Sequence, residues 1–157
     1  MRRLVHLAPL SLALLLSACG SGEPWLPADA VLPDGSRYRG ELVDGLLQGQ
    51  GRLDYRNGSY YQGEFKDGLF HGAGEWHGAD GEHYSGEFQH GSFHGQGRLQ
   101  HSDDSHYQGA FKAGQPSGEG RFSSAELNYS GAFAHGLYDG PGKLEWLAGG
   151  SHQGQFS

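Results

Sequence analysis

The histidines are the first side chains to consider for chemistry, because imidazole is a common metal ligand and a common acid or base near neutral pH. The chain has ten histidines. Six of them form three pairs at matching places in a repeated pattern: His71 with His94, His83 with His106, and His90 with His135. Two imidazoles that share a zinc ion must each place a nitrogen about 2.0–2.1 Å from it. Whether these pairs can meet depends on the elements that carry them.

A second candidate is the polar run His101-Ser102-Asp103-Asp104-Ser105-His106, which contains the residue types of a hydrolase. A catalytic nucleophile needs a base, an orienting group and oxyanion donors brought to it from other elements. No second segment offers such a set, and polar residues of these types are ordinary in turns. Glycine runs such as 91–97 lack the Lys-Ser/Thr of a phosphate loop. We therefore predict no catalytic residues and no cofactor.

Cys19, the only cysteine, closes an N-terminal segment that is typical of export signals. Arg2 and Arg3 precede an apolar run over residues 4–16, which is too short to span a bilayer. The closing Leu-Ser-Ala-Cys resembles the lipobox of bacterial lipoproteins. The resemblance implies cleavage before Cys19 and acylation of that residue, and two acyl chains suffice for stable anchoring. The alternative is an ordinary secretory signal with an incidental cysteine.

This interpretation divides the chain into a lipoprotein signal peptide (1–18), a lipidated cysteine with a flexible tether (19–28) and a folded domain (29–157). Gly20 follows the cysteine, and this favours the outer membrane over retention at the inner membrane of the bacterial cell envelope. Loss of the two leader arginines would leave nine Lys and Arg against 18 Asp and Glu, a net charge of −9. So acidic a chain argues against nucleic acid as a partner and against a basic patch for anionic headgroups.

The folded domain is built from a repeat of about 23 residues. The segment YQGEFKDGLFHGAG, which begins at Tyr61, returns as YSGEFQHGSFHGQG from Tyr84. Weaker copies begin at Tyr38, Tyr107 and Tyr129, and a partial sixth copy begins at His152. A fixed period of this length indicates a repeat architecture in which each unit contacts only its neighbours. Such a sheet tolerates the modest hydrophobic content of 36%.

Glycines and aromatic residues alternate within each unit. Counted from the leading Tyr, positions +2, +7, +11 and +13 are Gly, and position +4 is Phe or Leu. Strand geometry places positions 0, +2 and +4 on one face and the polar +1 and +3 positions on the other. We expect the glycines at +2 and +13 to leave room for rings to lie flat, and those at +7 and +11 to bracket a turn with positive φ. Each unit is thus a predicted β-hairpin.

The pattern YxGEFxxGxxHGxG resembles the MORN repeat (membrane occupation and recognition nexus) over residues 29–157. The resemblance implies an all-β fold, an elongated single-layer antiparallel sheet of tandem β-hairpins, and a scaffolding role in protein–protein contact. Units four and five depart from the pattern. Ala110 and Ala132 replace the usual Glu, and Ser117 and Asp139 replace the usual His. Unit four is also one residue short, and the loss falls between strands, within residues 123–128.

Ten aromatic side chains would form a continuous stripe on one face of this sheet: Tyr61, Phe65, Trp76, Tyr84, Phe88, Tyr107, Phe111, Phe122, Tyr129 and Phe133. The stripe is either the core of the sheet or a partly open groove, since exposed apolar patches mark interaction sites. We predict a non-enzymatic module that binds or scaffolds envelope proteins. A glycan- or peptidoglycan-binding module that uses the aromatic groove is the alternative.

The predicted sheet also indicates whether the paired histidines can share a metal ion. Equivalent residues of neighbouring units would lie about 10 Å apart, because one strand intervenes. A shared zinc ion would then need a third residue from that strand, and we predict no metal site. The sixth copy stops after its first strand, so its free edge could pair with a second copy or with a partner strand. The alternative is that the sequence is a fragment of a longer array.

Overall fold

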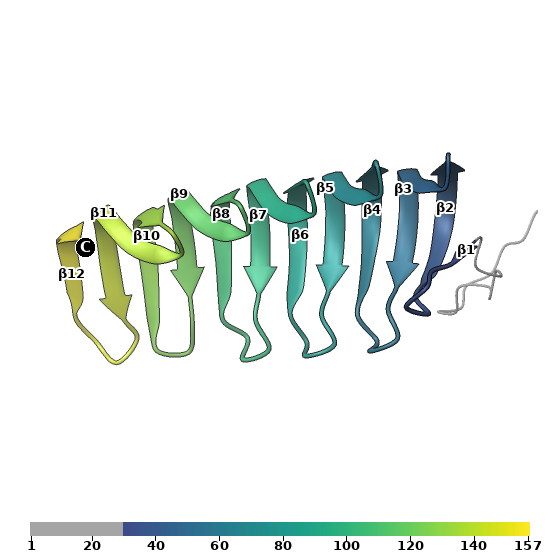
Figure 1. Ribbon diagram of the computed structural model, residues 1–157. Helices are drawn as coiled ribbons and strands as arrows, with labels where there is room; N and C mark the ends of the chain where they lie inside the picture. The colour runs from purple at the N-terminus through teal and green to yellow at the C-terminus, as the bar shows by residue number, and fades with distance from the viewer. Residues whose placement is uncertain (1–29) are drawn as a thin grey trace, which may run out of the picture.

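A computed structural model describes residues 30–157, which form one open antiparallel sheet whose strands follow the order of the chain (Figure 1). The predicted all-β, single-layer fold is confirmed. The predicted signal peptide, the predicted lipidation site Cys19 and the predicted tether lie outside the described residues. The twelve strands are β1 (Ala30–Val31), β2 (Arg37–Val43), β3 (Leu46–Asp54), β4 (Tyr60–Lys66), β5 (Leu69–His77), β6 (His83–Gln89), β7 (Ser92–Gln100), β8 (His106–Lys112), β9 (Gln115–Ser123), β10 (Leu127–Ala134), β11 (Leu137–Trp146) and β12 (Ser151–Phe156).

Each unit closes its hairpin with a two-residue turn. In unit two, Asp67 and Gly68 have φ of +52° and +82°, and Lys66 pairs with Leu69 across them. Two successive positive φ angles define a type I′ turn, whose twist matches that of the flanking strands. The glycine at +7 therefore supplies positive φ in the turn, as the sequence predicts. The same pairing of a residue with φ near +50° and a glycine recurs at Asp44-Gly45, His90-Gly91, Ala113-Gly114 and His135-Gly136.

The glycine at +11 has a different place from the one predicted. Gly72 has positive φ (+56°), but it lies inside β5 and not beside the turn. Gly63 pairs with Gly74 while Glu64 pairs with His71, so the register shifts between the two pairs. This β-bulge follows from the extra residues on the return strand, and bulges bend strands and increase their twist. The hairpin ends accordingly curl over along one long edge of the sheet (Figure 1).

Short polar turns join one unit to the next. Between β3 and β4, the Tyr55 amide donates to the Ser59 carbonyl (2.9 Å), and the Asn57 side chain accepts from the Ser59 amide (3.0 Å). The turn between β9 and β10 is shorter, and it closes with a bond from the Ser124 amide to the Leu127 carbonyl (2.9 Å). Tyr129 still pairs with Phe122. The missing residue therefore leaves the register of the sheet unchanged, as predicted.

The leading tyrosine of each unit lies flat on the sheet over two glycines. A Cβ atom added at Gly63 would lie only 2.6 Å from the Tyr61 hydroxyl oxygen and 2.5 Å from the Gly74 Cα. The Tyr61 hydroxyl donates to the Glu64 carbonyl (2.8 Å), which lies at the bulge. The glycines thus leave the space that the ring fills, and the hydroxyl satisfies a carbonyl that the register shift displaces.

Neighbouring rings then cover the tyrosine. Phe70 stacks on Tyr61 with the ring centroids 3.8 Å apart. The Phe65 and Phe88 rings approach edge-on at 5.0 and 4.9 Å. Phe65 belongs to the same unit and Phe88 to the next, so each tyrosine couples two units. The five leading tyrosines are at most 2% exposed, although the sheet has one layer: Tyr38, Tyr61, Tyr84, Tyr107 and Tyr129.

Gly86→Ala should destabilise the sheet, because the new Cβ would lie 2.5 Å from the Gly97 Cα and 2.6 Å from the Gln96 carbonyl oxygen. We expect a loss of about 1–3 kcal/mol in the free energy of unfolding, measured by urea denaturation. Gly154→Ala is the matched control at the same motif position. Its Cβ would meet only the exposed His152 side chain, at 3.3 Å, and equal losses in the two variants would contradict the packing role of the glycine.

Candidate functional site

The predicted aromatic stripe exists, but most of it is the core of the sheet. Eight of its ten members are buried, at 5% exposure or less: Tyr61, Phe65, Tyr84, Phe88, Tyr107, Phe111, Tyr129 and Phe133. Trp76 and Phe122 are half-buried and pack against them. The stripe is therefore not an open groove along its whole length. Any ligand on this face must bind where the covering rings are missing.

Such a place occurs in unit four. The residue at +9 covers the leading tyrosine with a stacked ring in units two, three and five, at centroid distances of 3.8–3.9 Å: Phe70, Phe93 and Tyr138. Unit four has Pro116 at this position, paired with Phe111. A hollow of about 410 Å³ opens there. It is lined by Leu99, His101, Tyr107, Pro116, Phe122, Phe133, Gly136, Leu137 and Tyr138.

The lining of this hollow is almost entirely apolar. Its residues come from strands β7 to β11 and from two of the turns between them, and seven of the nine are aliphatic, aromatic or proline. Leu137 stands at its border with 70% of its surface exposed. His101 is the one imidazole of the lining, and its Nδ1 lies 3.8 Å from a carboxylate oxygen of Glu82. A hollow of this size and chemistry fits an apolar side chain or a small apolar ligand.

Sequence reasoning named Tyr107, Phe122 and Phe133 among the binding candidates but did not single out this hollow. The missed signal is Pro116, which breaks the run of large residues at +9: Leu47, Phe70, Phe93 and Tyr138. Pro116 indicates a hollow only when the +9 side chain is known to pack on the leading tyrosine. The alternation of apolar and polar residues along a strand does not predict that contact.

Burial also changes the acidity of the tyrosines. Removal from water raises the pKa of Tyr84 and of Tyr107 to about 12, with smaller contributions from Glu87 and Glu119 respectively. Burial likewise raises the pKa of Tyr61 and of Tyr129 above its ordinary value. These hydroxyls remain protonated donors at neutral pH, and within the described chain their bonds go to carbonyl groups at the bulges. Their role is structural.

The polar run over residues 101–106 forms a turn. The Asp103 carboxylate accepts from the Ser105 amide (3.0 Å) and from the Ser105 hydroxyl (2.6 Å), and these bonds lower the pKa of Asp103. Two histidines at different positions of the repeat, His77 and His83, lie directly opposite each other across β5 and β6. A comparison of equivalent positions does not predict this contact. Glu75 lies beside the two histidines.

β12 pairs with β11 and is the last strand of the sheet (Figure 1). Self-association through its free edge stays a prediction. Over residues 30–157, no helix has the length and apolar character needed to cross a membrane.

Comparison with known families identifies the repeat. A model described as MORN repeat matches residues 38–60, 61–83, 84–106, 107–126 and 129–151. The chain therefore belongs to the MORN repeat family. The matched segments begin at the five tyrosines that lead the units. No curated protein sequence matches the chain directly. MORN repeats commonly act as protein-binding or scaffolding modules and are typically non-catalytic.

The raised tyrosine pKa values predict that the sheet loses stability in alkaline solution. The unfolded chain releases these protons near pH 10, whereas the folded chain keeps those of Tyr84 and Tyr107 to about pH 12. Their contribution is therefore complete below about pH 10 and falls as the pH rises toward about 12. Urea denaturation across this range should show a steep fall that becomes shallower in the double variant Tyr84→Phe/Tyr107→Phe. An unchanged slope in the double variant would contradict the assignment.

Proposed function

We propose that the chain is a non-enzymatic module that binds another protein of the bacterial envelope. The observation that carries this proposal is the apolar hollow above Tyr107, where Pro116 replaces a covering ring. An apolar side chain of a partner would lie in this hollow against Pro116 and the half-buried rings of Phe122 and Tyr138. Full burial of one such side chain contributes about 1.5–3 kcal/mol, which suits an anchor residue of a protein interface.

The lining favours a peptide over a glycan as the occupant. Phe122 and Tyr138 are half-buried, and their rings could stack on a sugar. However, Leu99, Pro116 and Leu137 surround them with aliphatic surface. A sugar needs partners for its hydroxyl groups, and among the lining side chains His101 and the tyrosine hydroxyls are the polar groups. If the ligand is a glycan instead, the protein should bind purified sacculi, and this binding can be measured alongside the capture of proteins.

Pro116→Phe should abolish partner capture, because the ring common at +9 would fill the hollow. Phe93→Tyr is the matched control, since it keeps a ring at +9 in unit three, as Tyr138 does in unit five. Each variant would be crosslinked in envelope extracts, and the captured proteins quantified by mass spectrometry alongside binding to purified sacculi. We expect one or more proteins to be lost with Pro116→Phe and retained with Phe93→Tyr. Capture that is equal in both variants would count against the hollow, and sacculus binding that Pro116→Phe removes would favour the glycan.

We further propose that acyl chains on Cys19 hold this module at the outer membrane. The support is the sequence alone, since Cys19 lies outside the described residues. The leader ends in Leu-Ser-Ala-Cys, and nine residues (20–28) separate the cysteine from the predicted domain. The acidic balance of the chain fits attachment through lipid better than attachment through a basic surface.

Cys19→Ser should release the protein from the membrane, because two acyl chains give stable anchoring and an unmodified chain has none. Fractionation of cells would follow the protein between membrane and soluble fractions. Intact mass measurement of the native protein should show cleavage before Cys19 and the added acyl mass. An unmodified product that still begins at Met1 would refute the anchor, whatever its fraction.

A further inference from the structure

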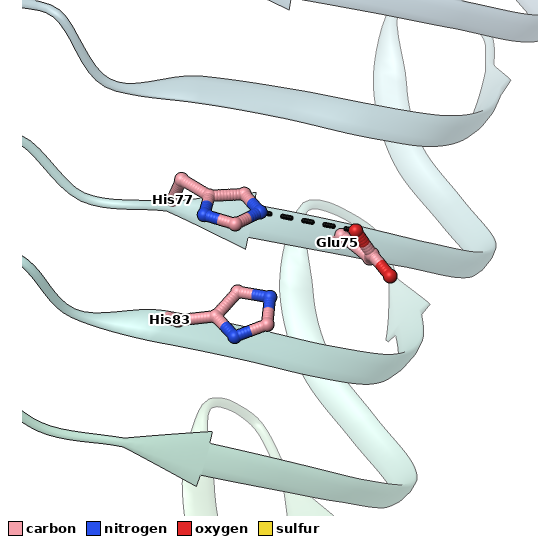
Figure 2. Close-up of side chains that lie close together, drawn as sticks. All are labelled: Glu75, His77 and His83. Atoms are coloured by element: carbon pink, nitrogen blue, oxygen red, sulfur yellow. Dashed lines mark ion pairs between the residues drawn. The ribbon is translucent and has the colours of Figure 1, made fainter. Parts of the chain in front are cut away.

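Three side chains gather on the polar face where unit two meets unit three. His77 of β5 and His83 of β6 lie directly opposite each other, and Glu75 precedes His77 by two residues on the same face. One ligand atom from each lies within 4.8 Å of the other two. The His77 Nε2 is 3.8 Å from a Glu75 carboxylate oxygen. Figure 2 shows the three side chains on one side of the two strands, with the dashed line marking this ion pair.

Stacking fixes the position of the His77 ring. Its centroid lies 4.1 Å from that of His83 and 4.2 Å from that of Tyr60, with the planes inclined by 24° and 18°. The Arg52 guanidinium covers the far face of Tyr60 at 3.9 Å. The imidazole is thus held between two rings and loses little further freedom on binding a ligand. Such preorganisation lowers the entropic cost of binding.

The Nε2 atom of His83 lacks a hydrogen bond within the described residues, although it is buried. An unpaired polar group away from water costs free energy, and in a native protein it calls for an explanation. A cation bound beside Glu75 and His77 would satisfy this nitrogen.

The third side chain of the group supplies charge. Glu75 lies beside the two imidazoles, and its side chain is 56% exposed. The carboxylate adds the negative charge that compensates a divalent cation.

We propose that Glu75, His77 and His83 bind a divalent transition-metal ion of the zinc class. Two imidazole nitrogens and one carboxylate oxygen are ligands that zinc takes readily, whereas magnesium and calcium prefer oxygen ligands alone. Three protein ligands leave one position open for water or for a side chain of a partner. Ligands of one zinc ion lie about 3.3 Å apart, so the group must close from its present spacing. The Glu75 side chain, which is 56% exposed, has room to move, and the His83 ring must tilt out of the stack so that its in-plane lone pair and that of His77 point at the same ion.

The site is particular to this boundary between units. The same row of cross-strand pairs elsewhere in the described sheet holds Val31 with Arg37, Asp54 with Tyr60, Gln100 with His106, Ser123 with Asn128, and Glu145 with Ser151. None of these pairs consists of two histidines. The repeat therefore supplies its own matched control, because His106 stands one unit away from His83 at the same motif position.

The test is calorimetric titration of ZnCl₂ into the untagged full-length protein at neutral pH, with MgCl₂ as the comparison ion. We expect one zinc ion per chain. His77→Gln and His83→Gln should each weaken binding by roughly tenfold or more, since loss of a ligand costs at least as much as loss of a supporting residue. His106→Gln should leave the affinity unchanged. Absence of zinc binding in the unaltered protein, or equal weakening by His83→Gln and His106→Gln, would overturn the proposal.

Two further variants guard against loss of folding. Glu75→Gln alters an exposed side chain, and it should weaken zinc binding while the circular dichroism stays unchanged. The double variant Arg98→Glu/Gln100→His places the same residue types one unit further along, beside His106. It should raise the stoichiometry from one zinc ion to two. A stoichiometry that stays at one would show that the three residues do not suffice and would overturn the assignment.

Discussion

The sheet depends on the contact between a tyrosine ring and the two glycines beneath it. A single layer has no second layer to bury its apolar face, so the rings must lie down on the backbone that carries them. The Tyr61 ring fits over Gly63 and Gly74, and its hydroxyl bonds the Glu64 carbonyl at the bulge. Phe88 of the next unit then covers its edge. Each ring is therefore buried by residues of its own and the neighbouring unit. This arrangement can be repeated along the chain without a thick core.

The alternation of residues predicts much of this fold, because period two and a fixed 23-residue repeat leave few other arrangements. It places tyrosine, glycine and phenylalanine on one face, and it assigns the space over the glycines to the rings. The bulge at Gly72 is beyond such reasoning, because a register shift depends on which carbonyls and amides pair. The two-residue turn at Asp67-Gly68 can be predicted from the sequence, since such hairpin turns favour the dipeptide Asp-Gly.

The candidate sites were predicted less well for a related reason. Comparison of units finds residues that are equivalent, whereas contacts across a sheet join residues that are not. His77 and His83 lie six positions apart and meet because the turn between them brings their strands side by side. In the same way Pro116 becomes informative only when the +9 side chain is known to cover the tyrosine. Local specialisation is tolerated because each unit is held by its neighbours, so one exchanged side chain opens a hollow while the register persists.

The strictly sequential order of the strands has a mechanical consequence. β1 and β12 form opposite ends of the sheet, and every strand runs across its long axis (Figure 1). A pull on the two ends therefore loads the hydrogen bonds of one strand pair at a time, as in the opening of a zipper, and does not shear a whole sheet at once. The array should yield under small forces, strand by strand from whichever end is pulled, and lengthen gradually.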